Sequence, residues 1–96
     1  MNKNHFDKFE NLFNAIASIS SVEECRLFLE DLCTIKELSD MNQRLEVAKL
    51  LSDGKNYQEI SKETGASSAT ISRVNKCLTY SDGYKSMISK IKVDKD

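Results

Sequence analysis

The residue types best suited to a specific chemistry lie together after Gly65, where small and hydroxyl side chains precede two cations. A serine or threonine hydroxyl donates hydrogen bonds to phosphate oxygens or base edges, and an alanine leaves room to contact a thymine methyl. The first backbone N–H groups of a helix also attract phosphate. This chemistry marks the following residues as candidate DNA contacts: Gln58, Ser67, Ser68, Ala69, Thr70, Ser72, Arg73 and Lys76.

Two short helices joined by a tight turn would position these side chains. Residues 57–64 and 68–79 are each predicted to be helical. Gly65 falls where the chain must turn, and glycine tolerates a left-handed backbone without a Cβ penalty. The apolar residues expected to pack between the two helices are Ile60, Ala66, Ile71, Val74 and Leu78. The stretch Tyr57–Lys76 is therefore predicted to be a helix-turn-helix.

Several of these candidates also have a simpler interpretation. Serine is a common helix cap, and either Ser67 or Ser68 is expected to cap the second helix. Arg73 could contact DNA, remain a solvated surface charge or form an ion pair with an acidic helix, whereas Lys76 is most simply a solvated lysine. Because helix-turn-helix geometry also occurs in proteins that bind other proteins, a protein-interaction module stays an alternative.

The whole chain is predicted to be all-α, because it lacks proline and is rich in Leu, Lys, Glu, Ser and Ile but poor in Val. Its 96 residues are expected to form one helical domain, residues 1–96. Apolar spacings of three and four predict four more helices. These cover residues 5–19, 22–33, 35–51 and 81–91, with ends outside regular structure at 1–4 and 92–96.

Capping signals mark several expected helix ends. A Ser, Thr or Asn followed three residues later by Glu has the form of a capping box, in which each side chain accepts a hydrogen bond from the other residue's backbone N–H. Such pairs occur at Ser21–Glu24, Thr34–Glu37 and Asn56–Glu59. Gly54 suits the C-terminal cap of helix 35–51.

The three N-terminal helices carry a large apolar surface. Residues 5–19 hold an apolar stripe made of Phe6, Phe9, Leu12, Phe13, Ile16 and Ile19. Helix 22–33 is expected to turn inward Val22, Cys25, Phe28, Leu29 and Leu32. The pattern alone leaves open whether the phenylalanine stripe packs inside the chain or on a partner subunit. Helix 35–51 is apolar on more than one side, so we expect it to be buried as the spine of the fold.

The charge distribution favours DNA binding by the C-terminal half, although the net charge is only −1. Residues 22–46 hold seven acidic and three basic side chains, a balance of −4, whereas residues 47–96 hold nine basic and six acidic ones, a balance of +3. A local basic footprint matters more for DNA than total charge does. A chance asymmetry is the alternative, and the overall charge slightly favours a protein partner.

Composition argues against several other classes of protein. The odd number of cysteines, without a secretory leader, indicates reduced thiols in a cytoplasmic protein; they are Cys25, Cys33 and Cys77. The single histidine, His5, lies far from them in sequence, so neither a metal site nor another cofactor is expected. No apolar run approaches the roughly 20 residues of a membrane span. Without a glycine-rich phosphate loop or paired catalytic carboxylates, the chain is not expected to be an enzyme.

The segment from Leu32 to Leu78 resembles the Trp repressor superfamily. The resemblance is carried above all by ETGASSATISRVNKCL, residues 63–78, which combines Gly65-Ala66, Ala69-Thr70-Ile71 and Arg73 in the repressor's spacing. Within the superfamily, MNQRLEVAKLL, YQEIS and TGASSATISRVNKCL are similar to the Trp-repressor-related branch labelled YerC/YecD.

The resemblance implies a six-helix, Trp-repressor-like fold and an intertwined homodimer. Residues 5–54 would then form the dimerisation core, residues 56–79 the helix-turn-helix and residues 81–91 the C-terminal helix. The two recognition helices would enter successive major grooves of a near-palindromic double-stranded DNA site, about 34 Å apart. The implied function is a sequence-specific transcriptional regulator, and we expect a repressor.

Tryptophan is not expected to be the effector. In the Trp repressor it slots between the spine helix and the recognition helix and sets their separation. The resemblance matches Arg73 to the arginine that stacks on the indole, but aligns Gln43 with the second arginine and Val74 with the glycine that leaves room for the ring. A valine there should clash, at a cost of about 1–3 kcal/mol. A different small-molecule effector remains an alternative, with the candidate site Gln43, Arg44, Arg73 and Cys77.

Overall fold

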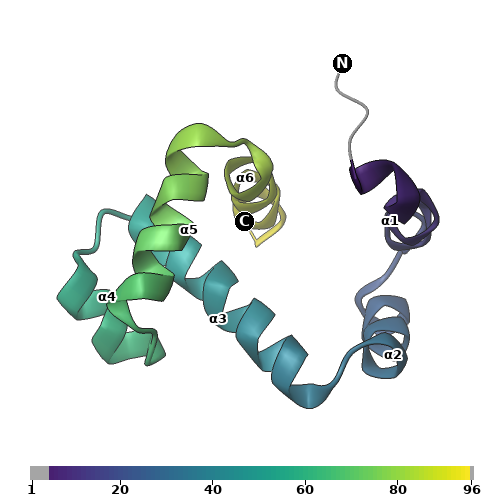
Figure 1. Cartoon of the computed structure of the whole chain (residues 1–96), viewed down its shortest axis with the longest axis horizontal. Helices are drawn as coiled ribbons and strands as arrows, with labels where there is room; N and C mark the ends of the chain where they lie inside the picture. Colours follow the sequence, from purple (N-terminus) through teal and green to yellow (C-terminus); the bar gives the residue numbers. More distant parts are fainter. Residues whose placement is uncertain (1–4, 96) are drawn as a thin grey trace. The chain divides into compact units, whose positions relative to one another are not determined.

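The computed structural model describes residues 5–95, with side chains for residues 6–91, and every element in that range is helical (Figure 1). A short 3-10 helix, η1, precedes six α-helices, which confirms the predicted all-α class. Their bounds are η1 His5–Phe9, α1 Glu10–Ala17, α2 Val22–Leu32, α3 Ile35–Ser52, α4 Tyr57–Thr64, α5 Ser68–Tyr80 and α6 Gly83–Lys95. The chain divides into two compact units, one ending at Ile35 and the other beginning at Lys36. The assignment of residues 5–54 to a dimerisation core stays a prediction.

The second unit is built around one apolar cluster contributed by four helices and the turn between α4 and α5. Its buried residues are Val47 and Ala48 from α3, Ile60 from α4, Ala66 from the turn, Ile71, Val74 and Leu78 from α5, and Ile88 from α6. The five residues predicted to pack inside the helix-turn-helix all belong to this cluster, which confirms that part of the prediction. The cluster holds α4 and α5 on one end of α3.

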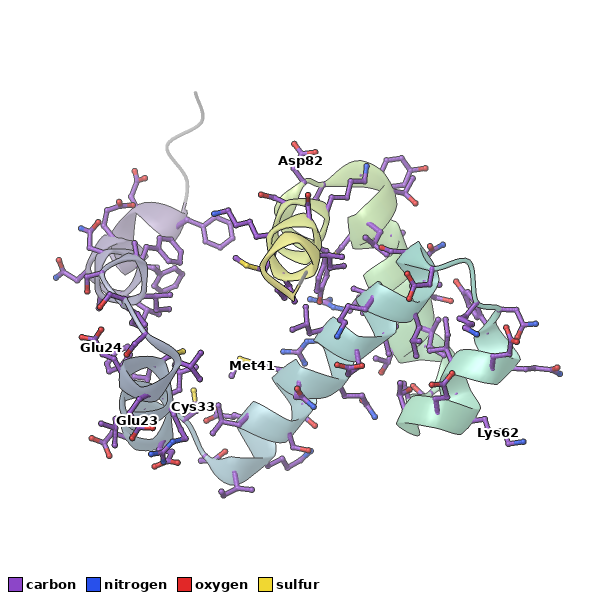
Figure 2. All side chains as sticks on the ribbon, turned by 180° about the vertical axis from the view of Figure 1, so that it is seen from behind. Glu23, Glu24, Cys33, Met41, Lys62 and Asp82 are labelled. Atoms are coloured by element: carbon purple, nitrogen blue, oxygen red, sulfur yellow. The ribbon has the colours of Figure 1, made fainter. Side chains whose placement is uncertain are left out.

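Within a single chain, the expected burial of α3 is met only in part, and burial of the rest by a partner subunit stays a prediction. Only Val47 and Ala48 are buried on α3. Ile35 at its start is 83% exposed, and Met41, labelled in Figure 2, is 39% exposed. The burial is confined to the C-terminal half of α3 because α4 and α5 pack there.

The first unit also exposes much of its apolar surface. Phe9 lies edge-on to both Phe6 and Phe13, with ring centroids 6.1 and 6.3 Å apart, yet each ring is at least 39% exposed. Two residues of α2 that were expected to face inward are exposed, Val22 at 86% and Leu32 at 48%. A unit made of η1 and two short α-helices has too few neighbouring elements to cover every apolar face.

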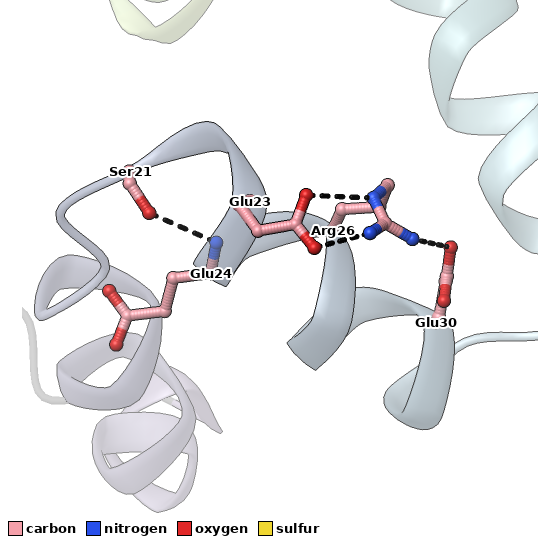
Figure 3. Close-up of polar contacts among 5 residues, drawn as sticks. All are labelled: Ser21, Glu23, Glu24, Arg26 and Glu30. Atoms are coloured by element: carbon pink, nitrogen blue, oxygen red, sulfur yellow. Dashed lines mark hydrogen bonds and ion pairs between the residues drawn. The ribbon is translucent and has the colours of Figure 1, made fainter.

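The capping signals are confirmed in full at one helix and in part at another. At α4 the Asn56 side chain accepts from the Glu59 N–H and the Glu59 carboxylate accepts from the Asn56 N–H, both at 2.9 Å. At α2 Ser21 Oγ accepts from the Glu24 N–H at 3.0 Å (Figure 3), but the Glu24 carboxylate accepts from the Ser20 N–H instead. The Thr34–Glu37 box stays a prediction.

A charge cluster on the surface of α2 accounts for part of the acidic balance of residues 22–46. The Arg26 guanidinium donates to Glu30 Oε2 at 2.8 Å and also to Glu23 (Figure 3). The hydrogen bonds to Glu30 and then to Glu23 raise the pKa of Arg26 above its ordinary value. These exposed pairs within one helix contribute little to stability, so the cluster is a solvated helix face.

Three predicted helix ends need correction. The irregular end expected at residues 92–96 is helical as far as Lys95, because neither glycine nor proline follows Gly83 to interrupt α6. This helix also begins at Gly83 rather than at residue 81. The first helix opens as a 3-10 turn, and its α-helical part ends at Ala17. The predicted irregular ends at residues 1–4 and at Asp96 lie outside the described residues.

Candidate nucleic-acid interface

The turn between α4 and α5 is held by a left-handed glycine and by the side chain of the last residue of α4. Gly65 has φ +76°, and its N–H donates to the Ser61 carbonyl at 2.8 Å. Thr64 Oγ1 donates to the Ile60 carbonyl at 2.7 Å and accepts from the Ala66 N–H at 3.1 Å. The backbone N–H groups of Gly65 and Ala66 are therefore satisfied, and the chain leaves the turn in a defined direction.

Ser67, rather than Ser68, caps the recognition helix α5. Its Oγ accepts from the Thr70 N–H at 3.1 Å and donates to Thr70 Oγ1 at 3.2 Å. The simpler interpretation of Ser67 as a helix cap is thus realised. Because Thr70 Oγ1 accepts this bond, its own hydrogen is left to donate elsewhere.

The cap gives a direct stability prediction. Ser67→Ala removes the acceptor for the Thr70 N–H and should lower the free energy of unfolding by about 0.5–2 kcal/mol, whereas Ser67→Gly should cost only a few tenths. Urea unfolding of the three proteins measures both differences. Equal losses for alanine and glycine would contradict a capping role.

The outer face of α5 presents polar side chains with no acidic residue among them. The exposed positions on this face are Ser68, Ala69, Ser72, Arg73 and Lys76, and Thr70 is half-buried. The guanidinium of Arg73 makes no hydrogen bond or ion pair with any other residue that the structure describes, so the predicted alternative of an ion pair with an acidic helix is not realised. Gln58 is exposed in the first turn of α4, and Lys62 projects from the end of the same helix (Figure 2).

The inner face of α5 is closed. Ile71 is fully buried and Val74 is 1% exposed, and both pack in the cluster that includes Val47 and Ala48 of α3. Two cavities beside these helices lie elsewhere, and neither Ile71 nor Val74 lines them. One is a polar cavity of about 290 Å³ between α3 and α4, lined by Ser39, Asn42, Gln43, Glu46, Leu50, Glu63 and Thr64. Another is an apolar cavity of about 420 Å³, lined by Leu45, Cys77, Ser81, Gly83, Tyr84 and Met87.

The four candidate effector-binding residues are not brought into one cavity. Gln43 lines the polar cavity and Cys77 the apolar one, while Arg44 and Arg73 line neither. The amide of Gln43 is also engaged, since Nε2 donates to the Thr64 carbonyl at 3.1 Å. Sequence reasoning missed this bond because its partners are 21 residues apart.

Other kinds of site find no support among residues 5–95. No group of three His, Cys, Asp or Glu side chains is placed to hold a metal ion in that range. Cys25, Cys33 and Cys77 are free and half-buried. Of the helices described, none combines the length and the apolar character that crossing a membrane would need.

Comparison with known proteins decides the family. The family described as Trp repressor protein matches residues 7–92. The chain belongs to the Trp repressor family. This is a fold of DNA-binding regulators and not of enzymes, as the composition indicated.

Similar members of the Trp repressor family confirm the predicted branch and fold. The chain is 49% identical over 86 residues to the uncharacterized protein YerC of Bacillus subtilis (strain 168), covering 88% of this chain and 83% of that protein. It is 44% identical to a TrpR-like protein from Eubacterium eligens ATCC 27750, with a TM-score of 0.85 and coverage of 96% of each chain. A crystal structure of a candidate Trp repressor from Staphylococcus aureus is 38% identical, with a TM-score of 0.84 over 94% of this chain and 96% of that one.

Proposed function

We propose that the protein is a sequence-specific transcriptional regulator, and specifically a repressor, that binds a near-palindromic DNA site as a homodimer without tryptophan. Each subunit would insert the N-terminal part of α5 into the major groove, and a two-fold axis would place the second α5 one helical turn away. Such a regulator works in the cytoplasm of a bacterium, the compartment that the reduced cysteines favour.

The exposed face of α5 is the observation that carries this proposal. Small side chains at Ser68, Ala69 and Ser72 let the helix approach base edges closely. The Thr70 hydroxyl and the first N–H groups of α5 are donors suited to phosphate, and Arg73 and Lys76 add positive charge further along. A helix built for solvent alone would carry acidic residues here, and α5 has none in its first turn.

The unsatisfied apolar surface supports the homodimer. The Phe6, Phe9 and Phe13 stripe of the first unit is exposed, and so are Met41 on α3 and Met87 beside the apolar cavity. Soluble monomers rarely leave contiguous apolar patches uncovered. A second copy of the chain is the partner we propose for these surfaces, with residues 5–54 as the dimerisation core.

The two alternatives have less support. A gated regulator with a non-tryptophan effector needs Gln43, Arg73 and Cys77 around one ligand, but Gln43 and Cys77 line different cavities and Arg73 lines neither. A protein-interaction module would use the same face of α5. The first turn of α5 has no acidic side chain, and this does not favour a protein partner over DNA. Both alternatives remain distinguishable from the proposal by experiment.

Selection of bound sequences from a random DNA pool tests the proposal. We expect a two-fold-symmetric consensus whose half-sites lie about 10 base pairs apart, because the dimer presents two identical helices. Ser68→Asp should abolish enrichment, since a carboxylate in the first turn of α5 favours the helix but repels phosphate. The matched control is Ser86→Asp, an exposed position on α6. A pool that shows no enrichment with the wild-type protein would favour a protein partner instead.

A further inference from the structure

The side chain of Gln43 on α3 forms a hydrogen bond with the C-terminal end of α4, the first helix of the helix-turn-helix. The Gln43 amide on α3 donates through Nε2 to the carbonyl of Thr64, the last residue of α4, at 3.1 Å. Both residues are half-buried. The last carbonyls of an α-helix have no partner within the helix, so this bond satisfies an acceptor that would otherwise need water or a ligand.

The position of Thr64 gives the bond a consequence for α5. Thr64 directly precedes Gly65, where the chain reverses, and its side chain already bonds Ile60 and Ala66 on either side of the turn. Holding the Thr64 carbonyl against α3 therefore fixes the peptide from which the turn starts. The direction in which α5 leaves the turn is fixed with it.

The packing of α5 on α3 also fixes the position of the helix-turn-helix. Val74 of α5 is 1% exposed and belongs to the same buried cluster as Val47 and Ala48 of α3. The separation of α3 and α5 is thus set by side chains of the chain itself. Val74 lines neither of the two cavities beside these helices.

We propose that Gln43 is a positioning residue for DNA recognition, whose bond to the Thr64 carbonyl holds the helix-turn-helix on α3 so that the protein binds DNA without an effector. This inference rests on the proposed function. It assigns to Gln43 a role different from the effector contact expected from the sequence. Gln43 touches no DNA itself but acts through the turn.

The test compares Gln43→Met, which keeps the length of the side chain but removes the donor, with the matched control Asn42→Met. Asn42 is exposed, lines the same cavity and makes no bond to Thr64. The loss of one neutral hydrogen bond should raise the DNA dissociation constant and the amide exchange rates of Gly65 and Ala66 about two- to tenfold. Exchange at Ile71, inside the core, should not change, and Asn42→Met should alter neither measurement.

A uniform rise in exchange that includes Ile71 would mean that Gln43 only stabilises the fold, and would overturn the inference. Wild-type exchange and affinity in Gln43→Met would overturn it as well, while leaving the proposed function intact. If the wild-type protein binds no DNA, the proposed function fails together with the role of Gln43 in it. The exchange data from the free protein would then still report whether the bond holds the turn.

Independence from an effector has its own measurement. Protein unfolded and refolded to remove bound small molecules should bind its selected DNA at full affinity. Added tryptophan, or a mixture of amino acids, should leave the dissociation constant unchanged. A tightening of about fivefold or more, the usual range of allosteric coupling, would overturn the inference.

Discussion

Ile71→Ala should lower the free energy of unfolding by about 2–5 kcal/mol, the usual cost of truncating a fully buried isoleucine. Ile71 is 0% exposed and packs where α3, α4 and α5 meet. The truncation removes apolar contacts and leaves a cavity that three helices cannot close without moving. The loss is a large fraction of the roughly 5–15 kcal/mol that stabilises a typical domain, so α5 would lose its fixed position along with stability.

Urea unfolding at one fixed protein concentration measures this loss, because a dimer's apparent stability depends on concentration. The matched control is Ser72→Ala, the next residue on α5, which is exposed. An exposed substitution of this kind should stay within about 0.5 kcal/mol of the wild type. A loss below about 1 kcal/mol for Ile71→Ala would contradict its place in the core.

The affinity for the selected DNA site should fall steeply with salt. Each phosphate neutralised by a cation releases condensed counterions, so the logarithm of the binding constant falls linearly with the logarithm of the salt concentration. A protein with about 6–10 phosphate contacts loses roughly 10³–10⁵ in affinity between 50 and 200 mM salt. This is the largest effect that we expect of any change in conditions.

Arg73→Ala should reduce the salt slope by about 1 for each subunit if the guanidinium contacts a phosphate. Lys36→Ala is the matched control, because Lys36 lies at the start of α3 and pairs with Asp40 at 3.2 Å. Retardation assays over a series of salt concentrations give both slopes, and circular dichroism checks that the variants stay folded. An affinity that ignores salt would exclude binding through phosphates.

Local hydrogen bonds at helix ends and the apolar periodicity of the helices could be predicted from the sequence. The Asn56–Glu59 box forms as predicted because both partners lie within one helical turn. The left-handed Gly65 and a serine cap at residue 67 or 68 follow from the backbone preferences of single residues, and the structure selects Ser67. Helical periodicity likewise identified Ile60 and Ile71 as core residues, since positions three and four apart share one helix face.

What the sequence by itself determined is the helix-turn-helix with its outward face. Residues that act within one helical turn, such as Asn56 and Glu59, carry their geometry in their spacing. The tertiary structure alone decided the role of Gln43, because its bond to Thr64 joins residues 21 apart and depends on how α4 packs on α3. It also decided which half of α3 is covered, since burial depends on what lies beside a helix and not on its own pattern.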